Sequence, residues 1–512
     1  MRRRATAAAA IAATVALALS GCVSWFLPPQ VSSTSTPTGE DVAADLTPFY
    51  HQVLSWSSCG NGLQCSTADA PLDWSDPGAN SIELALVRKP ATSANRLGSL
   101  LVNPGGPGGS GYDFVLDSVD YATDARLQAS YDIVGFDPRG VNRSTAVSCY
   151  DSPAELDAYI YDIFPGKPGS DEWLVAASAA SAAFGERCLE LTGALLGMVD
   201  TLSAARDLDM LRAILGDEKL SYLGYSYGTL LGQVYADHFP DKTGRLVLDG
   251  AVDPAATDFE ATAAQARGFE SALKAFLEDC ATASDCPFTG SIDESFVEIR
   301  ALLDSLDASP LSAADDDGRQ LGSSAMFTAI ILPLYNQGNW QSLRELFTTV
   351  MQGDPGYAFQ LADSYNNRNP DGSYSDNRTE AFIAINCLDA RGDGDVATMR
   401  SEANDLRRLA PVFGPQMSWG GTGCPNWPVP SKRDRVPIVA AGSADILVVG
   451  TTNDPATPYS WAVTVADTLQ NGHLVTYEGE GHTAYNKSNS CVNDVVDDFL
   501  IDGTVPAADP MC

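Results

Sequence analysis

The sequence predicts an α/β protein in which helices cover both faces of a mostly parallel β-sheet, and three observations support this fold class. Short apolar runs at 99–102, 131–136 and 444–450 have the length of buried strands. Stretches with helical spacing separate these runs. Loops rich in glycine follow several runs directly, as expected at the carboxyl edge of a parallel sheet. Strands buried on both faces lack polar alternation, so the pattern favours parallel pairing.

The first 21 residues predict a lipoprotein signal peptide. Three arginines at 2–4 precede an uncharged apolar stretch at 5–19, which is too short and too rich in alanine for a membrane span. The four residues LSGC that end at Cys22 resemble a bacterial lipobox, so we expect a lipid on Cys22; an ordinary secretory signal is the alternative. We therefore expect a protein exported to the outer face of the cytoplasmic membrane, either anchored in the cell envelope or released from it.

Composition divides the rest of the chain. Segment 22–44 is rich in Ser, Thr and Pro and lacks periodicity, so it predicts a flexible tether behind the lipidated cysteine. Residues 45–255 form the first part of the sheet-containing core. Within 256–430 the strand signal fades and amphipathic helices replace it, which predicts a large helical cap. Strand character returns in 431–512, which completes the core.

Charge limits the partners. The net charge of −35 disfavours nucleic acid and anionic lipid headgroups. We therefore expect membrane contact through the lipid anchor only, and a monomer. Such a surface suits cationic groups, such as the amino end of a peptide, although extracellular solubility alone also accounts for it.

Ten cysteines remain when Cys22 is set aside from the eleven, and an even number in an exported chain predicts disulfides. Sequence alone leaves the pairing open. Cys59 and Cys65 lie close together, as do Cys280 and Cys286. The simplest remaining pairs are Cys149–Cys188, Cys387–Cys424 and Cys491–Cys512. Zinc binding is the alternative, but no C-x-x-C pair occurs and there are only four histidines. We expect no metal site.

The pentapeptide G-x-S-x-G at 224–228 predicts a nucleophile elbow centred on Ser226. A short apolar run at 220–223 precedes it and helical spacing continues at 229–235, as this strand–turn–helix requires. The pattern alone is weak, because 44 glycines make a chance match common. The hypothesis therefore depends on a base and an acid elsewhere in the chain.

His482 is the best placed of the four histidines to act as the base. It lies in a glycine-rich loop directly after the strand at 473–477, at the sheet edge expected to carry the Ser226 turn. His51 lies before the sheet, His238 lies near the end of a helix, and His473 lies at the start of a strand. A structural loop histidine is the alternative role for His482.

Asp454 is the candidate acid. It follows the apolar strand at 444–450, and the proline after it disfavours helix there. Asp445 precedes the same strand and would lie at the opposite edge. Capping of a helix is the alternative role for Asp454. The chain order serine, aspartate, histidine is that of α/β-hydrolases and differs from that of chymotrypsin or subtilisin.

A glycine loop at 103–111, directly after an early strand, predicts an oxyanion-binding loop. Its two prolines have no N–H, so the donor is Gly105 or Gly106, joined by the N–H of Tyr227. The loop also contains G-x-G-x-x-G, a dinucleotide-binding pattern, but that lone match is weak beside the hydrolase motifs. We expect no cofactor.

Together these motifs resemble secreted actinobacterial tripeptidyl aminopeptidases, relatives of the prolyl aminopeptidases in the α/β-hydrolase superfamily. The resemblance spans about residues 45–512 and rests on six segments: 103–111, 136–140, 224–229, 247–250, 450–458 and 481–482. It implies an α/β-hydrolase fold with a helical cap, a triad of Ser226, Asp454 and His482, and action on peptides from a free amino terminus. Lipidated esterases and proteases of this type share the same motifs.

An aminopeptidase must bind the substrate ammonium group, which calls for carboxylates, and the resemblance suggests that the cap supplies them. Asp389 is one candidate, because a disulfide at Cys387 would hold it rigidly. Asp253, after the strand that ends at Asp249, is another. Any one of the 66 acidic residues is more often a solvated surface charge. Arg139 is expected to brace loops near the site or to form a structural ion pair.

The expected function is that of an exported serine hydrolase that releases short peptides, tripeptides by resemblance, from free amino termini through an acyl-enzyme. Hydrolysis of esters by the same triad, as in a carboxylesterase or lipase, is the alternative. A non-catalytic binding lipoprotein is a third hypothesis, but its fold would not require serine, acid, base and oxyanion glycines together. The absence of H-E-x-x-H from the sequence disfavours a metallopeptidase.

Overall fold

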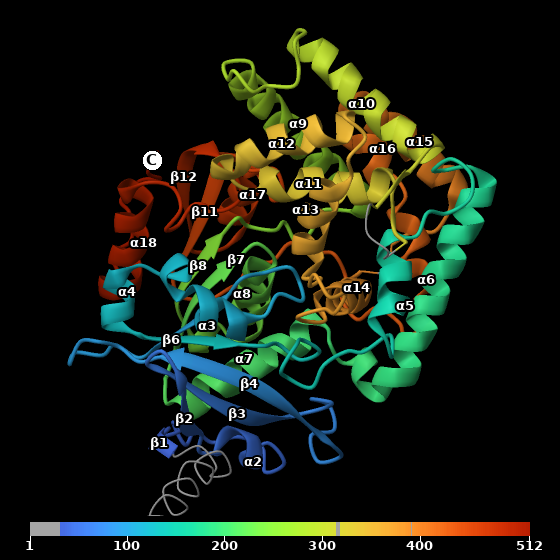
Figure 1. Cartoon of the computed structure of the whole chain (residues 1–512). Helices are drawn as coiled ribbons and strands as arrows, with labels where there is room; N and C mark the ends of the chain where they lie inside the picture. The colour runs from blue at the N-terminus through green and yellow to red at the C-terminus, as the bar shows by residue number, and fades with distance from the viewer. Residues whose placement is uncertain (1–30, 314–317, 391) are drawn as a thin grey trace, which may run out of the picture.

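The computed structural model describes residues 31–313, 318–390 and 392–512. The predicted signal peptide at 1–21 and the predicted lipid site at Cys22 lie outside the described residues. A twisted sheet with helices on both faces forms the body of the molecule, and a group of helices lies beyond one end of it (Figure 1). This architecture confirms the predicted α/β-hydrolase fold with a helical insertion.

Among the described residues, the main sheet has ten strands in the order β1-β2-β3-β4-β6-β5-β7-β8-β11-β12. The pairs among β1 to β4, and the β4–β6 pair, are antiparallel, and the strands from β6 to β12 pair in parallel. The carboxyl ends of the parallel strands therefore lie at one edge, where their loops meet. The strand bounds are β1 Val31–Thr34, β2 Ser55–Gly60, β3 Leu63–Pro71, β4 Ser81–Lys89, β5 Ser99–Asn103, β6 Asp132–Phe136, β7 Leu220–Tyr225, β8 Thr243–Asp249, β11 Ile446–Asn453 and β12 Gly472–Glu480.

Helices bury the two faces of the sheet in separate apolar layers. Along β5, Leu100 and Val102 pack in one layer and Leu101 in the other, because successive residues of a strand face opposite sides. The first layer contains α3 Gly111–Ala122, α4 Ala125–Ser130 and α18 Ser490–Asp502. The second contains α2 Thr47–Tyr50, α7 Thr201–Leu215, α8 Tyr227–His238 and α17 Tyr459–Thr468.

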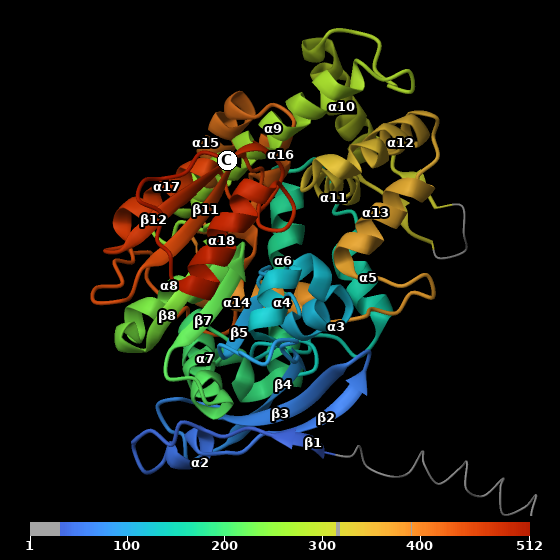
Figure 2. The same ribbon diagram turned by 90° about the vertical axis from the view of Figure 1, so that its left-hand side faces the viewer.

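The cap has an apolar core of its own, which includes Phe269, Phe276, Phe347 and Phe413. Figures 1 and 2 show its helices gathered beyond one end of the sheet, away from β1–β4. They are α9 Asp258–Cys280, α10 Ile292–Ala308, α11 Ser323–Leu334, α12 Trp340–Met351, α13 Gly356–Asn366, α15 Val396–Leu409 and α16 Phe413–Met417, with a small hairpin of β9 Leu311–Ser312 and β10 Gln320–Leu321. Two helices lie between β6 and α7. Helix α5 Pro153–Tyr161 contributes to both apolar cores, and α6 Asp171–Thr192 contributes to the second layer on the sheet.

One helix within the predicted cap belongs to the hydrolase core instead. Apolar side chains of α14 (Arg378–Asp389), among them Ala381, Ile385 and Leu388, are buried in the same layer as α7 and α8. A separate cap from 256 to 430 is therefore not what the structure shows, since this stretch crosses back onto the core. Amphipathic spacing could not reveal this, because it gives the buried face of a helix without identifying what buries it.

The described part of the predicted tether, residues 31–44, is packed and not flexible. Strand β1 pairs with β2, and the Thr38 N–H donates to the Ala213 carbonyl at 2.9 Å. The Glu40 carboxylate forms ion pairs with Arg212 at 2.6 Å and with Lys242. The prediction is wrong for this stretch because its partners lie far away in the sequence, where local composition gives no sign of them.

Among the described residues there are five disulfides, and they are the five expected pairs. The bridge between Cys387 and Cys424 ties the last turn of α14 to the segment that follows α16. The remaining four are Cys59–Cys65, Cys149–Cys188, Cys280–Cys286 and Cys491–Cys512.

Candidate active site

Ser226 occupies a sharp turn between β7 and α8. Its φ of 54° and ψ of −123° lie in a region that residues other than glycine rarely adopt. A Cβ at Gly224 would lie 2.4 Å from the Gly228 carbonyl oxygen, and one at Gly228 would lie 2.8 Å from Asn103 Oδ1. Both flanking glycines are therefore needed, as the predicted elbow requires.

Asp454 and His482 form a hydrogen-bonded pair. His482 Nδ1 lies 2.9 Å from both carboxylate oxygens of Asp454. Asp454 is 2% exposed and also accepts the N–H groups of Ala456, Thr457 and Thr483, which fix its orientation. The Thr457 hydroxyl adds a bond to Asp454 Oδ2 at 3.0 Å. With Nδ1 held by the acid, Nε2 is the histidine atom left for proton transfer.

The elbow and the histidine meet at the end of β8. The Ser226 N–H donates to the Asp249 carbonyl at 2.9 Å. At the next residue, a Cβ on Gly250 would lie 3.3 Å from His482 Cε1. Among the described residues, Ser226 Oγ has no hydrogen-bond partner and is free to meet a substrate. Serine–histidine contacts commonly tighten only when substrate binds.

The carboxylate of Asp249 was not among the predicted site residues, yet it holds the histidine loop. It is fully buried and accepts the N–H groups of Ala484 at 3.0 Å and Tyr485 at 2.8 Å. Burial raises its pKa, while these N–H groups and the nearby Lys487 oppose the shift. The only sign of it in the sequence was an acidic residue at the end of an otherwise apolar strand.

Two backbone N–H groups are available for an oxyanion, those of Gly106 and Tyr227. Among the described residues neither has a hydrogen-bond acceptor. The Gly105 N–H, the other predicted donor of this loop, donates to Asn103 Oδ1 at 2.9 Å. A Cβ on Gly105 would lie 2.8 Å from the Ser226 Cβ, so this glycine serves close approach of the loop to the elbow. Of the two predicted glycines, Gly106 is therefore the one whose N–H is available to an oxyanion.

Neither carboxylate predicted to bind the substrate amine has the expected surroundings. Asp389 is 6% exposed, and its oxygens accept the N–H and the hydroxyl of Thr201 at 3.0 and 2.5 Å. Burial raises its pKa to about 6. Asp253 accepts the Ala255 N–H and lies beside Gln233, about two helical turns along α8 from Ser226. These contacts do not support either residue as the amine-binding group.

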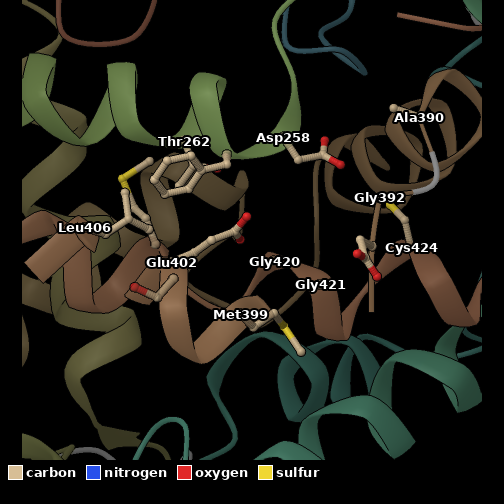
Figure 3. A pocket seen from close by; sticks show the side chains of 14 residues that line it. Asp258, Thr262, Ala390, Gly392, Met399, Glu402, Leu406, Gly420, Gly421 and Cys424 are labelled. Carbon is tan, nitrogen blue, oxygen red and sulfur yellow. The ribbon is translucent and has the colours of Figure 1, made fainter. Parts of the chain in front are cut away.

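A pocket of about 190 Å³ lies in the cap between α9, α15 and the segment before Cys424. Figure 3 shows Asp258 and Glu402 extending into it from opposite sides. Asp393 is the third carboxylate in the lining, beside apolar groups such as Met399. Burial and the charges of Asp393 and Asp258 raise the pKa of Glu402. The pocket is therefore acidic, and it does not include the residues around Ser226. No group of three or more His, Cys, Asp or Glu within the described ranges is arranged to hold a metal ion.

Arg139 forms a structural ion pair, one of its two expected roles. Its side chain is fully buried and bonds both oxygens of Asp207, at 2.6 and 2.7 Å. Its remaining N–H groups donate to the carbonyls of Pro71, Leu72 and Met198. All of its partners are in the core, so it braces loops and makes no contact with the triad residues.

Comparison with known proteins agrees with this geometry. Residues 410–512 match the family described as TAP-like protein. Serine protease Hip1 of Mycobacterium tuberculosis is 36% identical, over 91% of this chain and 92% of that protein. Carboxylesterase B of the same organism is 34% identical, over 95% and 94%. Tripeptidyl aminopeptidase of Streptomyces lividans is 30% identical, over 90% and 86%. With such similarity along almost its whole length, and with the elbow, acid–base pair and oxyanion donors in place, this chain belongs to the TAP-like family of α/β-hydrolases.

Proposed function

We propose that this protein is a serine peptidase that removes short peptides from substrates with a free amino terminus. The observation that carries the proposal is the arrangement of Ser226, the Asp454–His482 pair and two free N–H donors at one sheet edge. Similarity to a serine protease and to a tripeptidyl aminopeptidase supports peptides as substrates.

The geometry supports the following reaction. His482 Nε2 accepts the proton of Ser226 Oγ as that oxygen attacks the scissile carbonyl, and Asp454 stabilises the resulting imidazolium. The N–H groups of Gly106 and Tyr227 stabilise the oxyanion. His482 then protonates the leaving amine, which departs and leaves an acyl-enzyme on Ser226. Water, deprotonated by His482, hydrolyses the ester and restores the serine.

Ester hydrolysis is the second candidate, because carboxylesterase B is also similar over nearly the whole chain. An ester carbonyl would use the same nucleophile, base and oxyanion donors. The two functions differ in what binds the substrate on either side of the carbonyl and in the leaving group, which is an amine from a peptide and an alcohol from an ester.

A parallel assay separates these functions. A tripeptide anilide with a free amino group, its N-acetylated counterpart and a short-chain ester would be compared on the wild type and on Ser226→Ala. Recognition of the ammonium group predicts that the free peptide is cleaved at least about tenfold faster than the acetylated one, a difference of about 1.4 kcal/mol. Equal rates for the two peptides would remove the aminopeptidase proposal. Rapid cleavage of the ester alone would favour the esterase.

We infer also that the protein is exported and carries a lipid on Cys22. The lipobox-like residues LSGC support this, as do five disulfides, which persist in oxidising compartments. Labelling of growing cells with an alkyne-tagged fatty acid should mark the wild type but not Cys22→Ser. An unlabelled wild type with a cleaved N-terminus would show an ordinary secretory signal instead.

A further inference from the structure

Helix α14 contacts the oxyanion loop near its first turn and is linked to Tyr227 through Thr201 at its last turn. At its first turn, a Cβ on Gly108 would lie 2.8 Å from the Arg378 carbonyl oxygen and 2.9 Å from the Phe382 nitrogen. The loop that carries the Gly106 N–H therefore rests directly on the backbone of this helix. Its opposite end is Asp389, whose carboxylate is buried.

A chain of hydrogen bonds connects Asp389 to the other oxyanion donor. The Thr201 hydroxyl donates to Asp389 Oδ2 at 2.5 Å, and the same hydroxyl oxygen lies 2.5 Å from the Tyr227 phenol oxygen. A threonine hydroxyl has one proton, so the phenol must be the donor in the second bond. Burial raises the pKa of the Tyr227 phenol, which keeps that proton in place.

Tyr227, whose side chain is held in this way, also carries the backbone N–H that faces the oxyanion position. Tyr227 is the first residue of α8, where a backbone N–H has no partner within the helix. Its direction depends on the backbone at 226–227 and on whatever fixes the Tyr227 side chain. That side chain is 8% exposed, and its only hydrogen bond within the described part of the chain is the one to Thr201.

We propose that Asp389 is a positioning residue that acts through Thr201 and the Tyr227 phenol to aim the Tyr227 N–H at the oxyanion. Because α14 supports the Gly106 loop at its other end, this one helix sets the separation of the two donors. The Cys387–Cys424 disulfide secures the helix close to Asp389. The proposal rests on Ser226 as the nucleophile but not on the choice between peptide and ester substrates.

The surroundings of Asp389 suit a charged carboxylate whose role is to hold Thr201. Arg433 opposes the rise in its pKa that burial causes, and Asp200 adds to it. Asp200 is in turn 3.6 Å from the Lys432 ammonium group. The N–H of Thr201 supplies a second bond to the carboxylate, so the hydroxyl is held in a defined direction.

The test uses Asp389→Asn, Thr201→Val and Tyr227→Phe in the full-length protein. Loss of one oxyanion donor costs about 10²–10³-fold in kcat, so a misdirected donor should cost about tenfold, with KM nearly unchanged. The rate at which a fluorophosphonate modifies Ser226 should fall by a similar factor, because the phosphoryl oxygen occupies the oxyanion position. Asp389→Asn combined with Tyr227→Phe should be no slower than the slower single variant. Thr201→Ser, which retains the hydroxyl, should restore the rate.

Asp157 provides a control away from α14. It is half-buried, and its carboxylate accepts hydrogen bonds from the Arg368 guanidinium and the Tyr374 hydroxyl. Asp157→Asn should lower the melting temperature and leave kcat and the modification rate unchanged. Equal loss of rate in both variants would show that Asp389 acts through fold stability alone. Wild-type rates in Asp389→Asn, Thr201→Val and Tyr227→Phe would overturn the proposal directly.

The two proposals fail in distinguishable ways. A wild type that cleaves no peptide or ester, but whose Ser226 still reacts with the fluorophosphonate, contradicts the proposed function while the role of Asp389 remains measurable. A wild type that cleaves its substrate, with variants that match it in kcat and in modification rate, contradicts only the role of Asp389.

Discussion

The backbone carbonyl of Asp249 accepts the N–H of Ser226 at 2.9 Å, so the last residue of β8 holds the nucleophile turn. The carboxylate of the same residue accepts the N–H groups of Ala484 and Tyr485 in the histidine loop. Strand β8 pairs with both β7 and β11, which makes it an interior strand of the sheet. The proposed nucleophile and the loop of the proposed base are thus both attached to the end of β8.

Asp249→Ala should reduce both stability and activity. It would leave two buried N–H groups without acceptors, at a cost of about 1–3 kcal/mol each in the free energy of unfolding. A looser histidine loop should lower kcat by about tenfold or more, since small displacements of catalytic groups are costly. Urea unfolding and steady-state kinetics on the same preparations measure the two effects. Asp249→Asn, which keeps one acceptor oxygen, should lie between the wild type and Asp249→Ala; a fully active alanine variant would contradict this role.

Glu40 should stabilise the fold through the segment that we had expected to be flexible. Glu40→Gln weakens the pairs with Arg212 and Lys242 and should cost about 1–3 kcal/mol in the free energy of unfolding. Burial would raise the pKa of Glu40, but hydrogen bonds from Lys242 and Arg212 lower it below its ordinary value. A lowered carboxyl pKa gives stability that is present at neutral pH and lost in acid. The difference between wild type and variant should therefore shrink below about pH 4.

A chain that begins at residue 45 should be less stable than one that begins at residue 31; equal melting temperatures would show that the segment contributes nothing.

Asp497 should make stability fall as pH rises. Burial and the nearby Asp124 carboxylate raise its pKa to about 7, although the hydrogen bond from Tyr485 and the nearby Arg126 oppose the shift. A raised carboxyl pKa gives stability that is complete below the unfolded value of about 4 and is lost towards pH 7. Asp497→Asn stays neutral and keeps a partner for Tyr485. The free energy of unfolding of this variant should therefore rise relative to the wild type as pH increases from about 4, the pKa of the unfolded carboxyl, to about 7, its pKa in the folded protein. A constant difference across that range would show that Asp497 ionises normally.

The disulfide between Cys387 and Cys424 should matter for activity as well as for stability. It closes a loop with a sequence separation of 37 residues, and its removal in Cys387→Ala/Cys424→Ala should cost about 2–4 kcal/mol. Since it secures the end of α14, kcat should fall too. The bridge Cys491–Cys512, with a separation of 21, lies at the C-terminus and serves as the control. Its removal should lower the melting temperature without a change in kcat; loss of kcat in both double variants would make the effect unspecific.

Features carried by local sequence were predictable. Ser226, Asp454 and His482 each follow a strand directly, so their motifs could be placed at one sheet edge without coordinates. Each disulfide joins two cysteines that follow one another in the sequence with no other cysteine between them. For the oxyanion loop the prolines reduced the choice to two glycines, and only the contact between Asn103 and Gly105 separated them.

Features that depend on distant pairs could not be predicted. Glu40 and Arg212 are 172 residues apart, and Asp389 and Thr201 are 188 apart. Composition predicted a flexible tether over 31–44, because Arg212, the partner of Glu40, lies far outside this segment of the sequence. Asp389 was expected to face the substrate amine, but its carboxylate is directed to Thr201. The sequence shows that a carboxylate is present, but it does not show which group that carboxylate contacts in the fold.

The central claim is that Ser226 is the nucleophile, and covalent labelling tests it most directly. The protein would be treated with a fluorophosphonate, measured by intact mass spectrometry and digested to locate the modified residue. We expect one label per chain, on Ser226, with loss of hydrolysis in proportion to labelling and no label on Ser226→Ala. A label on another residue, or undiminished hydrolysis by fully labelled protein, would contradict the account.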